Sequence, residues 1–417
     1  ITMNKRKYRL FVICCLVLDL LVMLISGYRY LDRKIPDEIQ ISRGKKTEDV
    51  TEVLSTPFVT FEEAVTVSQD GGYILPCKLL GYIPFKEIKV TPADDQEIYV
   101  SGSTIGIYMQ TEGVLVIDTG EIQNRNGETE EPARNIIRQG DYIISFNGEK
   151  ISTKRELIDD ISELDGSEVT LGISRKGESI PVSVTPVKDK KGDYKLGIWV
   201  RDDTQGIGTL TYVDQNGNYG ALGHGISDID TAQLLNIRNG ALYKARILAI
   251  NKGSKGNPGE LAGYICYDDR NILGTIEANS RNGIYGQFTG IADEAITLKK
   301  MPAAYKQEVK IGTATILCST DGEVKEYDAE IRKIDLNHED TNKSFVIKVT
   351  DKELLVATGG IVQGLSGSPV IQNGKIIGAV THVFVQDASS GYGMFIENML
   401  ENTESLFYVL GNFIPIT

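Results

Sequence analysis

The sequence predicts a mainly β protein with a single apolar helix at its N-terminus. Its 417 residues include 43 glycines, and from residue 195 onward short apolar runs alternate with glycine-rich turns. Many short strands separated by turns are typical of β-sandwiches and β-barrels. About 220 residues are enough for two small β-barrels with a cleft between them, so we expect a barrel pair in residues 195–417.

The composition limits the partners and the chemistry of the protein. Its formal net charge is −13, whereas a nucleic-acid partner requires a basic patch, so we expect no nucleic-acid binding. The five cysteines include no Cys-x-x-Cys pair and no Cys/His cluster at metal-ligand spacing. The sequence therefore predicts no metal, no cofactor and no disulfide framework. One disulfide among Cys77, Cys266 and Cys318 stays open, although buried thiols are the favoured interpretation.

Residues 1–30 have the composition of a membrane segment. A basic flank precedes the mostly apolar run from Leu10 to Ile25, and its members are Lys5, Arg6, Lys7 and Arg9. A helix of that length reaches about 24 Å, against a hydrocarbon core of about 30 Å. The basic flank places the N-terminus on the cytoplasmic side, and the rest of the chain outside the cytoplasm. Because no small-residue cleavage site follows, an uncleaved signal-anchor is favoured over a cleaved signal peptide.

Residues 31–95 are polar and mixed in composition. The stretch from Asp32 to Asp49 is strongly charged and resembles a linker. Short strand candidates follow it, at Phe58 to Val67 and at Ile83 to Val90. We therefore expect a linker with short strands between the membrane segment and the first folded domain.

Residues 96–190 carry the pattern of a small folded domain. Asn147-Gly148 between two apolar runs predicts a two-residue hairpin turn. Thr153 with Glu156 three residues later predicts a capping box at the start of a helix from Lys154 to Leu164. Two further strands, joined by a turn, close the unit at Val169 to Arg175 and Ser179 to Thr185.

This succession is similar to a bacterial PDZ domain, and the similarity covers residues 96–188. The triplet Ile105-Gly106-Ile107 stands where that family has its hydrophobic-Gly-hydrophobic carboxylate-binding loop. The resemblance implies β-augmentation, in which the C-terminus of a peptide adds a strand beside residues 107–109 and loop N–H groups bind its carboxylate. It thus implies protein C-termini as partners. A PDZ fold that serves only as an internal brace is the alternative.

The segment Gly364-Leu365-Ser366-Gly367-Ser368-Pro369 is the strongest candidate for a catalytic turn. Glycines at 364 and 367 reach backbone angles that a Cβ forbids. The main-chain N–H groups of Gly364 and Ser366 can then converge on one point as an oxyanion hole. One such donor typically contributes about 10² to 10³ in rate. An ordinary turn between two strands is the alternative.

Three histidines are candidates for the general base that a serine nucleophile requires. His224 lies between Gly223 and Gly225, and the lack of side chains on both sides leaves its imidazole approachable. His338 lies in a polar loop, and His382 follows the serine by sixteen residues. We expect His224 to be the base and His382 to form a wall of the specificity pocket. A structural role for His224 in the core is the alternative.

A histidine, a later aspartate and a terminal Gly-x-Ser-Gly-x-Pro follow the His…Asp…Ser order of chymotrypsin-like proteases. Residues 195–417 are therefore predicted to form a chymotrypsin-like double β-barrel serine protease domain. Leu365 stands where trypsin-type enzymes carry an aspartate before the serine, so the salt bridge that matures trypsin zymogens cannot form. The strand from Gly378 to His382 is expected to run along the cleft and to pair with the substrate backbone.

The whole pattern resembles the stage IV sporulation protein B family of serine peptidases, peptidase family S55, over essentially residues 5–417. Besides the membrane segment and the PDZ domain, two motifs carry the resemblance: Gly220-Ala221-Leu222-Gly223-His224-Gly225-Ile226, and Gly364-Leu365-Ser366-Gly367-Ser368-Pro369-Val370 with Gly378-Ala379-Val380-Thr381-His382-Val383-Phe384. The resemblance implies that Ser366 is the nucleophile, His224 the base and Asp351 the acid of a catalytic triad.

The resemblance also implies a biological role. Members of this family are signalling endopeptidases of endospore-forming bacteria, exported from the forespore into the space between the two membranes. There they cut a membrane-bound regulatory protein, so that an intramembrane protease can release a late mother-cell sigma factor. Some members also cleave themselves near the N-terminus, which would free this chain from its anchor.

Both the choice of Asp351 as the acid and the prediction of a peptidase have alternatives. Asp351 lies only fifteen residues before the serine, whereas the acid of chymotrypsin-type enzymes lies far upstream. A turn carboxylate is therefore another interpretation of Asp351, and Asp228, Asp230 and Asp335 stay open as the acid. A second hypothesis for the chain is a catalytically inactive, membrane-anchored PDZ adaptor that binds protein C-termini. The presence of His224 together with an intact Gly-Leu-Ser-Gly turn favours the peptidase.

Overall fold

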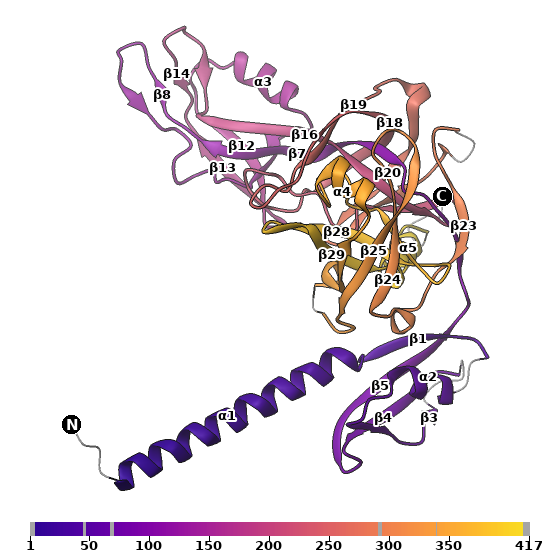
Figure 1. Cartoon of the computed structure of the whole chain (residues 1–417). Coiled ribbons are helices and arrows are strands. Elements are labelled where there is room, and N and C mark those ends of the chain that lie inside the picture. The colour runs from indigo at the N-terminus through magenta and orange to yellow at the C-terminus, as the bar shows by residue number, and fades with distance from the viewer. Residues whose placement is uncertain (1–4, 45–46, 67–70, 291–293, 339, 412–417) are drawn as a thin grey trace.

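The computed structural model describes residues 5–44, 47–66, 71–290, 294–338 and 340–411 of the chain. Figure 1 shows a long N-terminal helix, then a small sheet, and then a larger body. In that body a PDZ domain and a two-part β domain share strands of one sheet.

Helix α1 (Lys5–Lys34) extends away from the rest of the protein (Figure 1). Its most apolar window has a mean hydropathy of 2.7, and no part of that window is buried. At about 1.5 Å per residue, the helix spans roughly 45 Å. Helix α1 is therefore long and apolar enough to cross a membrane, and its position near the N-terminus also fits a signal sequence.

Residues 31–95 form a small domain with its own core. Its elements are β1 (Glu38–Ser42), α2 (Thr47–Leu54), β2 (Val59–Phe61), β3 (Val65–Thr66), β4 (Tyr73–Leu79) and β5 (Ile83–Ala93). The sheet has the order β1-β5-β4-β2, with β1 parallel to β5. Ile39, Leu75 and Ile88 are fully buried in its core. The sequence predicted a linker with short strands here, and this is corrected because buried isoleucines alternate with polar residues in β1.

The PDZ domain is centred on β10 (Tyr142–Phe146), α3 (Lys154–Ser162), β12 (Val169–Arg175) and β13 (Glu178–Val184). Thr153 and Glu156 form the predicted capping box of α3. Asn147 and Gly148 have φ angles of 47° and 90°, as the predicted hairpin turn requires. Short strands complete the domain, namely β8 (Ile122–Gln123), β9 (Thr129–Glu130), β11 (Glu149–Lys150), β14 (Val187–Lys188) and β15 (Tyr194–Lys195).

Two long strands, β7 (Thr104–Thr119) and β16 (Ile198–Val213), join the PDZ domain to the domain that the sequence predicts to be a protease, which is called the protease domain below. They pair antiparallel, with two bulges, over most of their length, from Ile198↔Thr119 to Thr209↔Thr104. At the PDZ end β7 also pairs with β10, and at the other end it pairs with β18 (Ile237–Asn251). The two domains are thus connected by a continuous β-ribbon as well as by the polypeptide loops.

The first part of the protease domain is built on this ribbon. Its further elements are β6 (Glu97–Val100), β17 (Asn218–Ala221), β19 (Glu260–Ile265), η1 (Asp269–Asn271), β20 (Ile272–Ile276), β21 (Ala278–Ser280), β22 (Gly283–Gln287) and β23 (Lys299–Pro302). Ile105, Leu210 and Leu242 are fully buried in its core. Strand β7 is central, because β16 pairs with one edge of it and β18 with the other.

The second part of the protease domain is a closed barrel of order β24-β25-β26-β29-β28-β27. Its elements are η3 (Lys306–Glu308), β24 (Gly312–Ser319), β25 (Val324–Ile334), η4 (Thr341–Lys343), β26 (Phe345–Val349), α4 (Lys352–Thr358), β27 (Pro369–Gln372), β28 (Lys375–Phe384), β29 (Asp387–Phe395) and α5 (Ile396–Gly411). Ile347 and Val370 are fully buried inside it. The predicted fold class is confirmed: mainly β, with an N-terminal apolar helix, a PDZ domain and a chymotrypsin-like double β-barrel.

The cysteines are free thiols. Cys77 lies in the core of the N-terminal sheet and Cys318 in that of the closed barrel. Burial raises the pKa of Cys77 to about 11 and that of Cys318 to about 12. Both therefore behave as small apolar side chains, which is the interpretation that the sequence favoured.

The core of the N-terminal sheet predicts a measurable effect of truncation. Leu75→Ala removes a fully buried side chain, so we expect this domain to lose about 2 to 5 kcal/mol of stability. The measurement is the alkylation rate of buried Cys77 in the full chain in detergent, read by peptide mass spectrometry; we expect a rise of at least about tenfold. Tyr82→Ala, at a position 87% exposed, is the control and should change little. Equal rates in the two variants would mean that residues 31–95 behave as a linker.

Candidate active site

The loop that carries Ser366 lies immediately before β27 in the closed barrel. Gly364 and Gly367 have φ angles of 98° and 93°, in the left-handed region that favours glycine. A Cβ on Gly367 would overlap the backbone carbonyl of Thr209. Both glycines of the motif are therefore required by the turn, as the sequence indicated.

Strand β16 holds this loop from the other part of the protease domain. The backbone N–H of Thr209 donates to the carbonyl of Ser366 at 3.2 Å, and the Thr209 hydroxyl donates to the carbonyl of Gly364 at 2.8 Å. The hydroxyl of Thr211 donates to the carbonyl of Gly367 at 2.7 Å. The position of the serine is thus fixed by the strand that also enters the PDZ domain.

Two backbone donors in the loop are available to a ligand. The N–H groups of Gly364 and Ser366 have no hydrogen-bond acceptor in the part of the chain that the structure describes. The N–H groups of Leu365 and Gly367 are bonded to neighbouring carbonyls, at 3.1 and 2.7 Å. The pair predicted to form the oxyanion hole is the pair that is left unbonded between residues 364 and 367.

Ser366, His224 and His382 line one cavity of about 380 Å³. Its lining comes from both parts of the protease domain, because residues 204–207 of β16 and residues 381–383 of β28 also border it. The structure thus brings the predicted nucleophile and the predicted base to the same cavity, from positions far apart in the sequence.

The glycine before His224 lets its loop approach the closed barrel. Leu222 and Gly223 have φ angles of 69° and 66°. A Cβ on Gly223 would stand 2.8 Å from the side chain of Thr381 in β28. This close approach places the imidazole beside the serine loop, which is a second role for the glycine besides the accessibility that the sequence suggested.

The hydrogen bond of His224 fixes its tautomer. Its Nδ1 lies 2.9 Å from the carbonyl oxygen of Gly225, and because a carbonyl only accepts, the proton must be on Nδ1. Nε2 therefore carries the lone pair that a general base needs. Burial lowers the pKa of His224 below its usual 6.5, and the bond to Gly225 opposes this shift.

The Ser366 hydroxyl is bonded to the backbone rather than to a histidine. Its Oγ donates to the carbonyl of Thr381 in β28 at 2.8 Å. The O–H of Ser366 must therefore turn away from Thr381 before Oγ can give its proton to His224. Ser368, by contrast, is completely buried, and its Oγ donates to the carbonyl of Leu365 at 2.6 Å.

His382 is the ring neighbour of His224. The two ring centroids are 4.9 Å apart, and the ring planes make an angle of 37°. The pKa of His382 is lowered to about 4, mainly by burial and in addition by the proximity of His224. Its buried Nδ1 has no hydrogen-bond partner among the described residues. His382 borders the cavity, where the sequence placed a wall of the specificity pocket.

Asp351 lies outside this cavity. It is the N-cap of α4, and its carboxylate accepts from the N–H of Leu354 at 3.0 Å and from that of Asp328 at 3.4 Å. Within the described part of the chain, no hydrogen bond joins Asp351 to His224. The structure therefore does not bring the predicted acid to the base; Asp351 serves as a helix cap, a role that was not predicted from the sequence.

The three rival aspartates are also engaged elsewhere. Asp228 and Asp230 form ion pairs with Arg201, at 2.6 and 3.1 Å, and Asp335 forms one with Arg33 at 3.2 Å. None of these borders the cavity. The group that orients His224 is the Gly225 carbonyl, and a sequence offers no signal for such a backbone contact.

The predicted carboxylate-binding loop, Ile105-Gly106-Ile107, is corrected by the structure. These residues lie in the middle of β7 and pair with β16 on one edge and with β18 on the other. Ile105 and Ile107 are buried, and a Cβ on Gly106 would stand 2.7 Å from the side chain of Ile265. Because both edges are occupied, no peptide can add a strand beside this triplet.

A groove suitable for a peptide lies instead between α3 and the start of β16. It has a volume of about 780 Å³, and its lining includes Ile158, Ile161, Leu164, Leu196, Ile198 and Trp199. The side chains of Ile158 and Trp199 are 55% and 65% exposed. Leu196-Gly197-Ile198 is a second hydrophobic-Gly-hydrophobic triplet, with Gly197 at φ 68°. This triplet is the feature of the sequence from which the groove could have been predicted.

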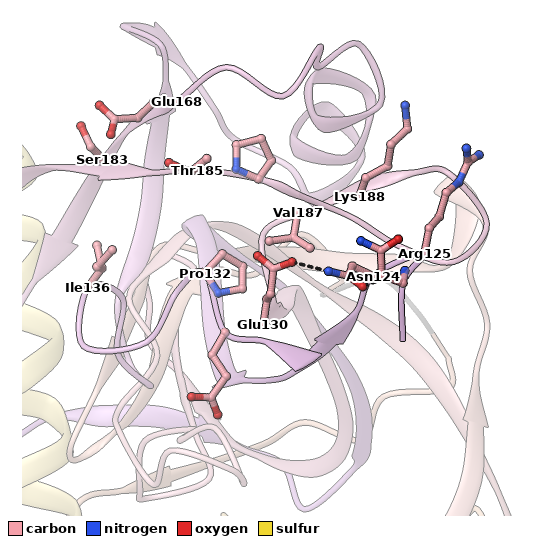
Figure 2. Close-up of a pocket in the computed structure, with 13 residues that line it drawn as sticks. Asn124, Arg125, Glu130, Pro132, Ile136, Glu168, Ser183, Thr185, Val187 and Lys188 are labelled. Atoms are coloured by element: carbon pink, nitrogen blue, oxygen red, sulfur yellow. Dashed lines mark hydrogen bonds between the residues drawn. The ribbon is translucent and has the colours of Figure 1, made fainter. Parts of the chain in front are cut away.

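A further cavity of the PDZ domain, shown in Figure 2, is mainly polar. It has a volume of about 760 Å³, and the side chains of Arg125, Glu168 and Lys188 border it. Across it Asn124 donates to the carboxylate of Glu130 at 2.8 Å (Figure 2). None of the predicted catalytic or peptide-binding residues lines this cavity.

The double β-barrel, the serine turn with its histidine and the attached PDZ domain define a PDZ-containing serine peptidase. The model of the family described as SpoIVB peptidase S55 matches residues 192–400, which is half of the chain, and a PDZ model matches residues 103–185. The chain belongs to the SpoIVB peptidase S55 family.

The individual proteins that this chain resembles share with it either a short stretch of sequence or a low sequence identity. A protein of Lactococcus lactis named a putative zinc metalloprotease is 38% identical over 78 residues, 18% of each chain, so this chain spans less than a fifth of that relative. The PDZ domain of an SdrC-like protein of Listeria monocytogenes is 23% identical, over 21% of this chain and 87% of that domain, with a TM-score of 0.18. The active form of the Rv3671c protease of Mycobacterium tuberculosis is 17% identical, over 48% of this chain and 74% of that one, with a TM-score of 0.25.

The two cavity histidines predict how stability depends on pH. The pKa of His382 is lowered to about 4 in the folded protein, so between pH 6.5 and 4 the unfolded chain binds more protons. The free energy of unfolding should therefore fall as the pH is lowered through this window. His382→Phe should reduce the difference in Tm between pH 7 and pH 5, and His338→Phe, outside the cavity, is the control. An unchanged difference in His382→Phe would contradict this assignment.

The two interpretations of Asp351 are separated by two substitutions. Asp351→Ala removes the N-cap of α4 and should lower the free energy of unfolding by about 1 kcal/mol, whereas asparagine also caps helices and should preserve it. If Asp351 serves only as a helix cap, the peptidase activity of Asp351→Asn should stay within severalfold of that of the unmodified chain. Stability and peptide hydrolysis are measured on both variants. A loss of about 10⁴ in kcat for Asp351→Asn at unchanged stability would mean that the carboxylate acts on His224.

Proposed function

We propose that the protein is a serine endopeptidase with Ser366 as nucleophile and His224 as general base. The observation that carries this proposal is that both residues line one cavity, beside two unbonded N–H groups at Gly364 and Ser366. The half-buried imidazole has its Nε2 available to take a proton, because Nδ1 donates to Gly225.

The proposed reaction begins when the Ser366 hydroxyl turns from Thr381 toward His224. Oγ attacks the carbonyl carbon of the substrate, and its proton passes to Nε2 of His224. The negative charge on the former carbonyl oxygen is stabilised by the N–H groups of Gly364 and Ser366, each worth about 10² to 10³ in rate. His224 then protonates the leaving amine, and water hydrolyses the acyl-enzyme by the reverse sequence of proton transfers.

The Gly225 carbonyl takes the orienting position that a carboxylate has in a full triad. It holds the same tautomer of His224, and its dipole favours the imidazolium that forms during the reaction. A neutral carbonyl stabilises this cation less than an ionised carboxylate does. We therefore expect a slower enzyme than a full triad gives, which suits a peptidase that cuts a specific protein once.

We further propose that the enzyme acts in sporulation signalling, outside the cytoplasm. Membership of the S55 family supports a role in which a membrane-bound regulatory protein is cut between the forespore and mother-cell membranes. Helix α1 and its basic flank support an anchored state with the PDZ and protease domains outside the cytoplasm. Self-cleavage near the N-terminus would release the enzyme from the membrane.

The exposed groove of the PDZ domain supports a protein C-terminus as partner. Its edge strand and its apolar wall provide what β-augmentation requires, namely main-chain bonding groups and a pocket for a side chain. We propose that the C-terminal segment of the substrate binds there. The second candidate, an inactive PDZ adaptor, is favoured by one observation, the bond of the Ser366 hydroxyl to Thr381 instead of to His224.

A substitution at the serine distinguishes the peptidase from the adaptor. Ser366→Ala should abolish hydrolysis and labelling by a fluorophosphonate, because without Oγ no covalent intermediate forms. Its Tm should change little, since one hydrogen bond to Thr381 is lost. Ser368→Ala loses a buried hydrogen bond and about 1 kcal/mol of stability, but should still be labelled. Unlabelled wild-type protein would contradict the peptidase and favour the adaptor.

A further inference from the structure

Strand β16 borders both functional sites of the protein. Its first residues, Ile198 to Val200, line the groove of the PDZ domain. Residues 204–207 line the cavity that contains Ser366. Thr209 and Thr211 then hold the serine loop by hydrogen bonds. In Figure 1 this strand runs from the PDZ domain into the protease domain without a break.

One edge of β16 is open along this path. Strand β7 pairs with β16 from Ile198 to Thr209 and occupies the other edge. Among the described residues, no strand pairs with the open edge before Leu210, where β17 begins to pair. Gln205 and Gly206 are exposed, and a Cβ on Gly206 would meet no atom within 4 Å. An unpaired edge of this kind offers N–H and C=O groups to an extended peptide.

The position of the triplet Leu196-Gly197-Ile198 sets the direction of such a peptide. This triplet leads into β16, so a peptide carboxylate bound by its N–H groups places the peptide's C-terminus at the beginning of the strand. The preceding residues of the peptide then run antiparallel to β16, toward Gln205 and onward to Ser366. An opposite polarity would lead the chain away from the catalytic cavity.

Helix α3 keeps the groove aligned with this edge. The backbone N–H of Lys154, at the start of α3, donates to the carboxylate of Asp202 at 2.8 Å, and the Lys154 ammonium lies 3.2 Å from the same carboxylate. The end of the groove nearest to the protease domain is therefore fixed to β16 itself. The groove is apolar on the α3 side, and Lys188 and Lys195 also border it, which suits an apolar C-terminal residue with a free carboxylate.

We propose that one substrate chain occupies both sites, with its C-terminus in the PDZ groove and its scissile bond at Ser366. The length of β16 between the two sites then sets the distance from the substrate's C-terminus to the bond that is cut. This inference rests on the proposed peptidase function and adds the substrate class: a protein with a free, extended, apolar C-terminal segment. Thr209 lies nine positions after Val200, which at about 3.3 Å per position is roughly 30 Å. The cut should therefore fall about ten residues before the C-terminus of the substrate.

The test maps cuts in synthetic peptides with the full chain in detergent. The probes are 25-residue peptides of mixed sequence that end in Ala-Ala-Val with a free carboxylate, and products are identified by mass spectrometry. We expect cuts to cluster about ten residues before the C-terminus and to move by four when four residues are added ahead of Ala-Ala-Val. A C-terminal amide should reduce cleavage at this position at least about tenfold.

A variant of the groove provides the second arm. Ile158 is half-exposed on α3, so Ile158→Lys should leave the fold intact while it places a charge in the apolar groove. We expect this variant to lose the preference for the free carboxylate and the fixed distance of the cut. Val356→Lys is the matched control, because Val356 is a 70% exposed apolar residue on the short helix α4. It should cut as the unmodified chain does.

The possible outcomes separate this inference from the proposed function. Fluorophosphonate labelling together with cuts that follow the local sequence, whatever the distance to the C-terminus, would overturn the inference and leave the peptidase intact. Cuts that require the free carboxylate but vary in distance would also overturn it, since the groove would then act only as a switch. Failure of both labelling and cleavage would overturn the proposed function, and the inference with it.

Discussion

The pairing of β7 with β16 is the constraint on which the rest of the structure depends. The two strands remain paired from the PDZ sheet into the first part of the protease domain, and their bulges adjust the twist without interrupting them. Thr209 and Thr211 of β16 then bond three carbonyls of the serine loop, across the interface of the two barrel parts. The proposed oxyanion hole, the proposed base and the proposed peptide groove are therefore all positioned by one strand. A displacement of β16 at the PDZ end has a direct mechanical route to the nucleophile, with no flexible linker to absorb it.

The features that the sequence predicted correctly are those decided by local geometry. The serine turn requires two left-handed glycines, and the loop of His224 requires a glycine where it meets Thr381, so both motifs are visible as glycine patterns. The capping box of α3 and the turn at Asn147-Gly148 depend on residues within four positions of each other. The apolar helix follows from composition alone. Each of these signals is complete within a short stretch of chain.

The features that the sequence could not decide depend on which neighbour the fold supplies. Ile105-Gly106-Ile107 and Leu196-Gly197-Ile198 have the same pattern, but the first lies between two strands and the second opens onto a groove. The family resemblance implies that Asp351 is the acid, but the helix that Asp351 caps begins at the next residue. In residues 31–95, the charged stretch that suggested a linker includes β1, a strand of a sheet whose core contains isoleucine, leucine and valine side chains. Pattern alone does not distinguish a strand edge from a strand centre.

The connection of α1 to the body has a consequence for the search for a substrate. The helix continues to Lys34, and the next residue, Ile35, is already completely buried in the N-terminal sheet. Asp335 and Asn337 of the closed barrel bond this junction, through Arg33 and the carbonyl of Ile35. These contacts join the end of the helix directly to the closed barrel. With α1 in a bilayer, the cleft stands at a set height and faces a set direction, so the enzyme scans the membrane surface in two dimensions and reaches only bonds presented at that height.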